Sequence, residues 1–486
     1  MYNTIYIMDD AELLRVLRKY NPWWEGREIP QIKTGTFTRR DFYPLEKQLS
    51  TREITAIIGP RRVGKTILLH QLIKKLLDKK VPPANIFYLS VDESELGAQA
   101  DFANIFDVYA KFILKQSFED LKGRTYIFLD EIQTIPNWST KLKNWYDLGY
   151  NLKFVISGSS SINLTHGIKE SLLGRLMTTI LLPLKFAEVL RIDGVWDTQN
   201  FMDLRKAFEK SALMNDPLIL FKQFEDLLGK ITSSRRYRIE TLLSRYLIVG
   251  GYPEFLTLES DYPLISQKMQ EKIRSTFYKD IILFYKLRNP VALNELFAML
   301  SAASSSKLNV VQTAKTLDVQ RPTLKTYLEH LTDIFLIENS EFYSKSRATR
   351  ARKLRKVYVC DAGIRNAAIS HLDESLLQEP GELGRVAEGV MFNHLRRLKF
   401  VLEPGPEPTL CYWENGCEVD FILEYKRKVI PIELKYQNDI GGEDVSGLKE
   451  CVAKLGSPFG ILISKKDFRQ TGNILVIPMW LFLIMI

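Results

Sequence analysis

Eight residues in the first part of the chain combine the residue types and spacing that bind a nucleotide phosphate. In this segment, GPRRVGKT, the glycines let backbone N–H groups approach a β-phosphate. Lys65 can neutralise charge on the β- and γ-phosphates, and the Thr66 hydroxyl can coordinate Mg²⁺ at the start of a helix. The candidate nucleotide-binding residues are Gly59, Pro60, Arg61, Arg62, Val63, Gly64, Lys65 and Thr66.

The elements around this segment have the order that such a loop requires. An apolar run at residues 52–58 predicts a strand, and apolar residues at helical spacing over 66–80 predict a helix. A chance match in a solvated loop is the alternative, and the flanking elements strongly disfavour it. We therefore expect ATP and Mg²⁺ to bind here.

An acidic pair follows a second apolar run. Residues 126–129 predict a strand of a parallel sheet, and Asp130 and Glu131 come directly after it. Ligands of such sheets bind at the carboxyl ends of the strands. We expect Asp130 to hold Mg²⁺ through water and Glu131 to polarise the attacking water.

Ser159 and Arg175 are two further candidates. A third apolar run, residues 153–156, leads into Ser-Gly-Ser-Ser-Ser, where the Ser159 hydroxyl could sense a γ-phosphate; a simple Ser/Gly turn is the alternative. Arg175 ends the segment SLLGR and could stabilise charge on the transferring phosphoryl group, in its own subunit or in a neighbour. A surface or salt-bridged arginine is an equal alternative.

Taken together, these segments resemble the AAA-type ATPases of archaea and bacteria in the broader STAND/AAA+ group. The matching segments are GPRRVGKT, LDEIQ, ISGSSS, SLLGR and LPLKFAEVL, and YLIVGGYP and FYKDI extend the match. The resemblance implies ATP hydrolysis, with an ADP-bound resting state or a nucleotide-driven switch. It also implies a possible homo-oligomer of no fixed size.

A second set of charged residues lies in the C-terminal part. Strand alternation places Asp420 opposite its apolar neighbours in residues 417–424, and it places Glu433 and Lys435 together in residues 429–435. A short basic turn at 426–428 would make the two strands neighbours. The two carboxylates could then hold Mg²⁺ or Mn²⁺, with Lys435 steadying the developing charge. Spacing alone favours the alternative, an amphipathic hairpin with an exposed charged face.

This region resembles the C-terminal domain of unknown function that commonly follows such ATPase cores, whose fold is related to PD-(D/E)XK nucleases. The resemblance rests on YWENGCEVDFILEYKRKVIPIELKY and on a helix near 384–395, where Val386, Val390 and Leu395 suit a buried stripe. It implies a metal-dependent endonuclease like Holliday-junction resolvases and restriction enzymes. Val419 replaces the usual proline. The motif positions are supplied by Glu388, Asp420, Glu433 and Lys435.

Between these regions, residues 308–338 predict a helix, a turn near Asp318 and a second helix from about Pro322, as in a winged helix. Such a pair serves DNA binding or protein–protein contact equally well. The following segment, 345–356, has seven basic residues and no acid. A run so dense is costly to bury and attracts phosphate, although solvated basic loops also occur. The candidate nucleic-acid contacts are Arg321, Lys325, Lys345, Arg347, Arg350, Arg352 and Lys353.

Composition sets the wider frame. A chain of 486 residues is too long for one hydrophobic core, and its net charge of +9 favours an anionic partner. The four cysteines form no CxxC pair, which indicates a reducing, cytoplasmic setting rather than a zinc site. The first 24 residues lack a signal-peptide pattern, and the apolar run from Ile477 is shorter than the roughly 20 residues that span a bilayer. We expect no membrane association and a buried last strand or helix.

The sequence therefore predicts a multidomain α/β protein. The expected boundaries are an N-terminal strap (1–48), a P-loop core (49–182), a helical lid over the nucleotide (183–290), a winged helix with the basic segment (291–360) and a PD-(D/E)XK-like α/β domain (361–486). We expect ATP hydrolysis coupled to nucleic-acid binding, DNA above RNA, and to metal-dependent cleavage. The alternatives are a signalling or scaffold ATPase whose nuclease-like domain binds without cutting, and a translocase.

Overall fold

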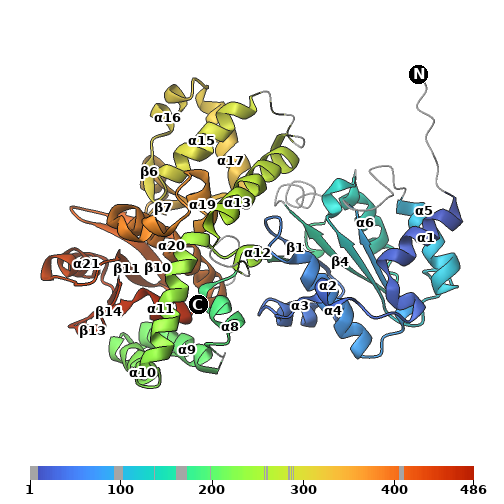
Figure 1. Cartoon of the computed structure of the whole chain (residues 1–486), viewed down its shortest axis with the longest axis horizontal. Coiled ribbons are helices and arrows are strands. Elements are labelled where there is room, and N and C mark those ends of the chain that lie inside the picture. The colour runs from blue at the N-terminus through green and yellow to red at the C-terminus, as the bar shows by residue number, and fades with distance from the viewer. Residues whose placement is uncertain are drawn as a thin grey trace. The chain divides into compact units, whose positions relative to one another are not determined.

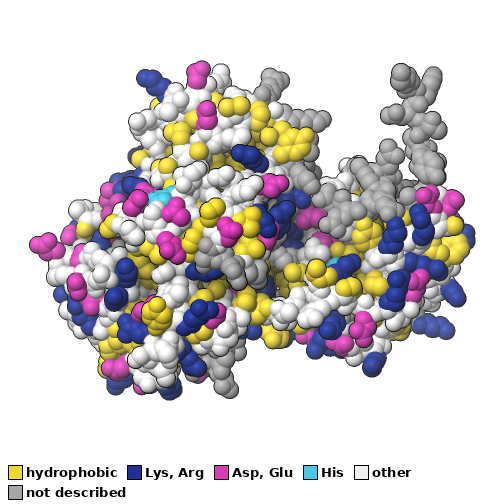
Figure 2. Space-filling view, in the orientation of Figure 1, with side chains coloured by type: hydrophobic (Ala, Val, Ile, Leu, Met, Phe, Trp, Pro, Cys, Tyr) yellow, Lys and Arg dark blue, Asp and Glu magenta, His cyan; other side chains and the backbone are white. Residues whose placement is uncertain are grey.

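The computed structural model consists of two compact units, Met1–Leu182 and Pro183–Ile486. The described residues are 9–91, 102–135, 137–159, 172–196, 199–256, 258, 261–282, 285, 287, 289–403 and 410–486. Figure 1 colours the first unit blue to teal and the second green to red. In Figure 2, basic and acidic side chains are interspersed over the visible face of both units, so this face carries no single basic patch.

The first unit is built on a five-stranded parallel sheet of order β2-β3-β4-β1-β5. The strands are β1 (Ile54–Ile58), β2 (Ile86–Ser90), β3 (Thr125–Asp130), β4 (Leu152–Gly158) and β5 (Leu176–Ile180). The first four are almost entirely buried, as their continuous apolar sequences predict for a sheet covered on both faces. Because all strands run in one direction, their carboxyl ends meet at one edge.

Helices and an N-terminal segment surround this sheet. The helices are α1 (Asp10–Tyr20), α2 (Gln31–Thr34), α3 (Phe42–Gln48), α4 (Lys65–Asp78), α5 (Phe102–Tyr109) and α6 (Trp138–Asp147). After α1, the Asn21 side chain exchanges two hydrogen bonds with the Tyr88 backbone (2.7 and 2.9 Å). The indoles of Trp23 and Trp24 both donate to the Ile86 carbonyl (2.9 Å). The N-terminal segment thus satisfies the outer edge of β2, which would otherwise be an open strand edge.

The second unit contains a nine-stranded mixed sheet of order β13-β14-β12-β11-β10-β9-β7-β8-β6. The strands are β6 (Ser306–Leu308), β7 (Ile337–Phe342), β8 (Arg355–Val359), β9 (Cys411–Glu414), β10 (Glu418–Tyr425), β11 (Lys428–Lys435), β12 (Gly460–Ser464), β13 (Arg469–Thr471) and β14 (Ile474–Pro478). Parallel pairing of β7 with β9 joins its two halves. The expected boundary at residue 360 therefore falls inside one continuous sheet.

The helices of the second unit pack around this sheet and each other. They are α8 (Phe186–Ile192), α9 (Gln199–Met214), α10 (Pro217–Gly229), α11 (Ser233–Val249), α12 (Pro253–Leu256), α13 (Tyr262–Thr276), α15 (Pro290–Ala302), α16 (Val310–Thr316), α17 (Arg321–Asp333), α18 (Arg347–Arg352), α19 (Ala362–Ala368), α20 (Pro380–Leu402), α21 (Gly442–Leu455) and α22 (Met479–Ile484). As the sequence predicts, the chain ends in a buried strand and helix, β14 and α22. Among the described helices, none is both long and apolar enough to cross a membrane.

Residues 183–290, which we expected to form a lid on the nucleotide-binding core, belong to the second unit. The Tyr425 hydroxyl at the end of β10 donates to Glu209 of α9 (2.9 Å), and the Phe221 ring of α10 stacks on Phe468 at 4.6 Å. Apolar periodicity predicts that a helix has a buried face but not which element covers it. The sequence therefore indicated the helices, but these contacts do not support the lid over the nucleotide that we expected.

The segment YLIVGGYP is explained by close packing within the second unit. A Cβ at Gly250 would lie 2.1 Å from Asp361 Oδ1, and the Gly251 N–H donates to Asp361 Oδ2 (2.8 Å). Asp361 also caps α19 by accepting from the Ile364 N–H (3.2 Å). The glycine pair thus lets α11 dock against the beginning of α19.

Candidate functional site

The loop between β1 and α4 has the backbone geometry of a phosphate cradle. A Cβ at Gly59 would lie 1.9 Å from the Leu181 carbonyl oxygen, so only glycine fits there. Arg62 and Gly64 have positive φ angles of 65° and 99°. These angles turn the chain directly into α4, whose first N–H groups lack helical acceptors and favour an anion.

Lys65 is held inside this loop by neutral acceptors. Its side chain is only 3% exposed, and Nζ donates to the carbonyls of Gly59 (2.9 Å) and Pro60 (3.0 Å). The Glu131 carboxylate lies 3.5 Å from the same nitrogen. Because the two carbonyls carry no formal charge, phosphate oxygens can replace them as acceptors.

Thr66 and Asp130 form a direct pair at the end of β3. The Thr66 hydroxyl donates to Asp130 Oδ2 (2.5 Å), which also accepts from the Tyr88 hydroxyl (3.1 Å). Asp130 Oδ1 accepts from the Ser157 hydroxyl. Burial raises the pKa of Asp130, and Glu131 adds to that shift. A hydroxyl and a carboxylate side by side are oxygen donors of the kind that Mg²⁺ takes, so the residues present fit this ion.

Glu131 follows in a left-handed conformation (φ 54°) and is linked to the end of β4. Burial acts to raise the pKa of Glu131, but Lys65 and Arg61 overcome it, and the net shift is downward. Gln133 Nε2 bridges Glu131 Oε2 (2.5 Å) and the Ser159 hydroxyl (3.0 Å). Glu131 is therefore an ionised carboxylate beside the loop, as a group that orients water must be.

Sheet order explains why these residues meet. Strand β4 lies between β1 and β3, so Ser157 and Ser159 fall between the phosphate loop and Asp130. Ser159 is buried, and Ser160 and Ser161 lie outside the described residues. The structure thus brings Lys65, Thr66, Asp130, Glu131 and Ser159 together at one edge of the sheet.

The charged residues of the C-terminal region also converge. Strands β10 and β11 form a hairpin whose turn residues, Lys426 and Arg427, both have positive φ, as a type I′ turn requires. Its register sets Asp420 opposite Glu433, and the Asp420 N–H donates to Glu433 Oε2 (3.2 Å). Lys435 Nζ lies 2.8 Å from Glu433 Oε1.

Glu388 reaches this cluster from α20. The helix buries Val386, Val390 and Leu395, as its periodicity predicts, and Glu388 points off that stripe toward the sheet. Burial, followed by the charge of Asp420, raises the pKa of both Glu388 and Glu433 to about 8. The four motif residues therefore share one buried site in which not all carboxylates ionise easily.

A fifth residue, Lys356 of β8, lies in the middle of this cluster. Its side chain is 4% exposed, and Nζ lies 2.6 Å from Glu418, 3.1 Å from Glu388 and 3.2 Å from Asp420. The sequence pattern grouped Lys356 with a basic run that is costly to bury and attracts phosphate, which is wrong for this buried residue. Carboxylates from distant segments compensate the burial of its charge.

The cluster as folded does not fit a metal ion. Among the described residues, no group of three His, Cys, Asp or Glu side chains could hold one. The carboxylate oxygens are instead paired with Lys356, Lys435, the Tyr358 hydroxyl and backbone N–H groups. The expected Mg²⁺ or Mn²⁺ at Asp420 and Glu433 is therefore not supported by this geometry.

Comparisons with known proteins bear on the two units separately. Residues 51–190 match the family described as an AAA domain. Residues 240–375 and 383–482 match two domains of unknown function, DUF8612 and DUF4143. The first unit contains an AAA-type ATPase domain. This match supports ATPase function.

Relatives of similar length are themselves uncharacterized proteins. One from Methanocaldococcus jannaschii is 26% identical over 401 residues, which cover 81% of this chain and 77% of that protein. One from Haemophilus influenzae is 21% identical, covering 86% and 90%. One from Mycobacterium tuberculosis is 22% identical, covering 80% and 72%. The similarity therefore extends over both units.

Two solved structures share a distant likeness with the chain. A Walker-type ATPase of Pyrococcus abyssi has a TM-score of 0.39 at 14% identity, covering 71% of this chain and 99% of that one. The ORC2 protein of Aeropyrum pernix in its ADP form has a TM-score of 0.29 at 12% identity, covering 76% and 98%. Both TM-scores are low, so neither structure is a guide to the whole chain.

Arg175 lies away from the phosphate loop of its own ATPase domain. Its carbonyl accepts from the Ile54 N–H (2.8 Å) at the amino end of β1, whereas the loop follows the carboxyl end. Ile54 and Gly59 are five residues apart along this strand, a span of roughly 17 Å. The Arg175 side chain pairs with Asp147 (2.9 Å), as in the salt-bridged alternative. A role on the same subunit's nucleotide is thus not supported.

The basic segment connects β7 to β8. Helices α16 and α17 precede it where the sequence predicts a helical pair, with Pro322 in the first turn of α17. Arg321, Lys325, Lys345, Arg347, Arg352 and Lys353 are exposed, and Arg350 is half-buried. Apart from Lys356, the run is therefore open to solvent.

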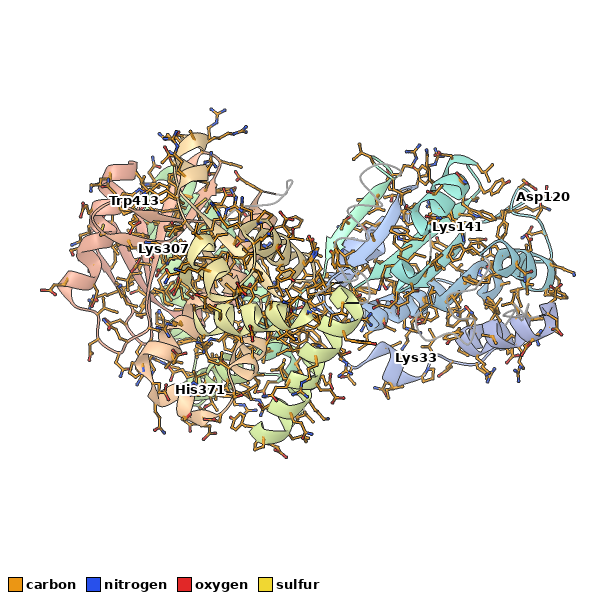
Figure 3. All side chains as sticks on the ribbon, turned by 90° about the horizontal axis from the view of Figure 1, so that it is seen from above. Lys33, Asp120, Lys141, Lys307, His371 and Trp413 are labelled. Atoms are coloured by element: carbon orange, nitrogen blue, oxygen red, sulfur yellow. The ribbon has the colours of Figure 1, made fainter. Side chains whose placement is uncertain are left out.

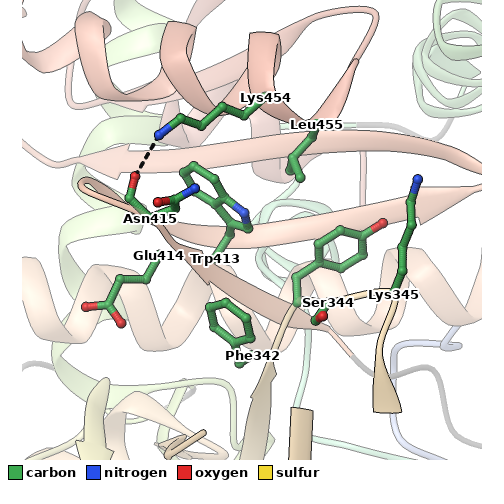
Figure 4. A pocket seen from close by; sticks show the side chains of 9 residues that line it. Phe342, Ser344, Lys345, Trp413, Glu414, Asn415, Lys454 and Leu455 are labelled. Atoms are coloured by element: carbon green, nitrogen blue, oxygen red, sulfur yellow. Dashed lines mark hydrogen bonds between the residues drawn. The ribbon is translucent and has the colours of Figure 1, made fainter. Parts of the chain in front are cut away.

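A pocket of about 340 Å³ opens beside the start of this segment (Figure 4). Phe342 and Tyr343 line it together with Trp413 of β9, and Lys345 and Lys454 are further lining residues. Lys454 Nζ donates to the Asn415 carbonyl (3.0 Å). Trp413 is also labelled in Figure 3, as is Lys307 of the same unit, which lies on β6.

Sequence reasoning missed several residues that complete both sites. In the ATPase domain, Tyr88 and Gln133 bond to Asp130 and Glu131, but nothing in their local sequence distinguishes them from core or loop residues. In the second unit, Lys356, Tyr358 and Glu418 join the cluster. The alternation of β8 could have revealed that Lys356 and Tyr358 share a face, though not what that face meets.

Proposed function

We propose that the chain binds ATP with Mg²⁺ in the loop 59–66, hydrolyses it, and uses the nucleotide state to control nucleic-acid binding by the second unit. One observation carries the ATPase part. At the carboxyl edge of a parallel sheet, Thr66 hydrogen-bonds Asp130, and the Lys65 ammonium lies beside the Glu131 carboxylate. That arrangement suits in-line attack of water on a γ-phosphorus.

Each residue then has a distinct role. Backbone N–H groups at the start of α4 and the Lys65 ammonium bind the phosphate oxygens, after Lys65 leaves the carbonyls of Gly59 and Pro60. Thr66 and Asp130 are the residues that would hold Mg²⁺, which neutralises phosphate charge when bound. Glu131 orients the attacking water and accepts its proton.

The link through Gln133 supports a sensing role for Ser159. Beside this link, the Ser159 hydroxyl itself donates to Glu131, so a γ-phosphate that takes this donor removes a hydrogen bond from Glu131. Glu131 would then be free to engage water only when ATP is bound. Loss of the γ-phosphate after hydrolysis restores the link.

Nucleic-acid binding by the second unit is supported by the exposed basic segment beside α17. Five exposed cations of residues 345–355 would neutralise phosphates, and Arg321 and Lys325 at the start of α17 lie where a recognition helix contacts a groove. DNA is the favoured ligand. In this proposal the nuclease-like cluster of the second unit does not cleave the bound DNA.

Metal-dependent endonuclease activity is the second candidate. The convergence of Glu388, Asp420, Glu433 and Lys435 favours it, because these residue types in this arrangement serve phosphodiester hydrolysis. Lys356 within the cluster weighs against it. Binding without cutting is therefore the proposal that these contacts support best.

Three assays on the full chain separate the possibilities. ATP turnover with Mg²⁺ is measured for the wild type and for Glu131→Gln, with ATP binding measured in parallel. Binding and cleavage of single-stranded, duplex and four-way-junction DNA and RNA are then measured with and without ATP, for the wild type and Asp420→Ala.

We expect turnover that Glu131→Gln loses while it retains ATP binding, together with nucleic-acid binding that depends on the nucleotide. Absence of turnover refutes the ATPase proposal, and nucleotide-independent binding refutes the coupling. Cleavage that Asp420→Ala abolishes would replace the binding proposal with the nuclease.

A further inference from the structure

Two lysines from neighbouring strands face the carboxylate cluster. Strands β6 and β8 pair antiparallel, with Lys307 directly opposite Lys356. Lys307 Nζ lies 2.8 Å from both Glu414 and Glu418 and is one-quarter exposed. Lys356 is buried and reaches deeper, to Glu388 and Asp420. Like charges placed opposite each other repel, so the acidic residues must hold both side chains in position.

Lys356 satisfies the cluster as a bound cation would. An ammonium has three N–H donors, and three carboxylates, Glu388, Glu418 and Asp420, surround this one within 3.2 Å. The group is a compact point charge, which makes it a closer substitute for a metal ion than an arginine would be.

Most of the oxygens that a metal would need are already engaged. Asp420 Oδ1 binds Lys356, and Oδ2 accepts from the Leu434 N–H (3.1 Å). Glu388 Oε1 accepts from Lys356 and from the Tyr358 hydroxyl (2.8 Å). A divalent ion that entered here would lie against the Lys356 ammonium, and the two positive charges would repel strongly at low local dielectric.

We propose that the Lys356 ammonium is a built-in cation that takes the place of a divalent metal in this cluster, so that the cluster accepts a metal only when Lys356 is removed. This inference concerns the second unit alone and does not depend on the proposed ATPase or on nucleic-acid binding.

The proposal is tested by measuring Mn²⁺ binding to the full chain without nucleotide. Electron paramagnetic resonance and titration calorimetry detect the binding. The variants are Lys356→Met, Lys307→Met and the double variant Lys356→Met/Asp420→Asn, beside wild type and Asp420→Asn. Lys307→Met is the matched control because it removes the same charge from the paired position without touching Glu388 or Asp420.

We expect Lys356→Met to gain one Mn²⁺ site that the double variant lacks, with affinity at least tenfold above any site in wild type or Lys307→Met. Wild-type Mn²⁺ binding that Asp420→Asn abolishes overturns the proposal. A folded Lys356→Met protein that binds no additional Mn²⁺ also overturns it.

Should Lys356→Met fail to fold alone, it is refolded with and without Mn²⁺. Recovery of folding by Mn²⁺ that the double variant does not share supports the proposal, and no recovery overturns it. Mn²⁺ binding and folding are read without ATP or DNA, so failure here is distinct from failure of the proposed function.

Discussion

Each unit of this protein buries a lysine beside carboxylates, and the two lysines are held in different ways. In the ATPase domain, Lys65 donates to two neutral carbonyls, and its nearest carboxylate oxygen is 3.5 Å away. In the second unit, Lys356 contacts three carboxylates at 2.6–3.2 Å. The burial of the two side chains is almost identical.

The comparison shows that burial alone does not identify a binding lysine. A cation held by neutral groups keeps most of its charge available for an anion, and it can exchange carbonyls for phosphate at little cost. A cation surrounded by carboxylates is already neutralised, and removing it leaves buried charges unpaired. Lys65 is therefore poised for a ligand, whereas Lys356 itself acts as one.

The largest effect is expected at the candidate nucleotide-binding site around Lys65. Glu131→Gln should lower the ATP hydrolysis rate by about 10²–10⁴-fold, because the amide cannot accept the proton of the attacking water. ATP affinity should change only a few-fold, since Lys65 and the loop are intact. Steady-state turnover and equilibrium nucleotide binding measure the two quantities.

Lys307→Met is the control for Glu131→Gln. It should keep wild-type turnover, because Lys307 forms its ion pairs with Glu414 and Glu418 of the second unit. A Glu131→Gln protein that hydrolyses ATP at the wild-type rate would show that another group activates the water.

The second expected effect tests the neutralised site. Lys356→Met should destabilise the second unit by about 3–5 kcal/mol, because it leaves three carboxylates without their shared cation. Lys307→Met should cost less, since its side chain and partners are partly exposed. Urea unfolding followed by proteolysis within the second unit measures both. Equal losses in the two variants would contradict the distinction drawn between them.

The third effect concerns pH, to which His70 of the first unit and Glu388 of the second unit should contribute with opposite sign. Burial lowers the pKa of His70, behind the loop on α4, to about 4, so the unfolded chain takes up its proton first as pH falls. Stability from His70 is complete above about pH 6.5 and falls by about 1.4 kcal/mol per pH unit below it. Glu388 has a raised pKa of about 8, so its contribution is present at low pH and is lost as pH rises toward 8.

Hydrogen exchange of each unit between pH 5 and 8.5 measures these two trends. The difference between wild type and His70→Asn should appear in the first unit as pH falls below about 6.5. The difference between wild type and Glu388→Gln should appear in the second unit as pH rises toward 8; subtraction is needed there because Glu433, His330 and His394 also titrate. The same pH dependence of the two differences would refute the prediction.

The fourth effect concerns the exposed cations near Lys356. Arg352→Ala and Lys353→Ala should each lower the slope of log affinity against log salt for duplex DNA by about 1, because each removes one phosphate contact. Arg27→Ala, an exposed arginine of the first unit, is the control with unchanged slope. A slope that stays the same in the double variant Arg352→Ala/Lys353→Ala would exclude the basic segment as the contact.

The smallest effect is expected at Arg175. Arg175→Ala should change stability by less than about 1 kcal/mol, as for other exposed ion pairs, and should leave ATP affinity unchanged. Any loss of turnover should appear only at protein concentrations where subunits associate, as for an arginine that acts on a neighbour. A loss of turnover that is independent of protein concentration would show that Arg175 acts on the nucleotide bound to its own subunit.

Local sequence was enough to predict the candidate ATP-binding residues, because most of them lie in one segment of the chain. The eight residues from Gly59 to Thr66 are consecutive, and the parallel-sheet rule extends the site to Asp130 and Ser159 at strand ends. This rule did not apply to Arg175, which was proposed from the segment SLLGR and which precedes β5 rather than following a strand. Alternation within β10 and β11 likewise predicted that Asp420, Glu433 and Lys435 converge.

What escaped prediction depends on pairing between distant segments. The sheet that unites β7 with β9 joins residues about 70 positions apart, and no periodicity within either strand specifies that partner. The helices of 183–290 likewise show an apolar face without naming the element that covers it.

The sequence by itself determined the phosphate loop, the acidic strand end and the two-stranded motif, since each follows from neighbouring residues and the geometry of a turn or strand. Only the tertiary structure placed Lys356 in the acidic cluster, apart from the exposed basic residues that precede it in the sequence. Its partners Glu388 and Asp420 are 32 and 64 residues away in the sequence. Because electrostatic attraction depends on distance in space, these charges interact only after folding has brought them together.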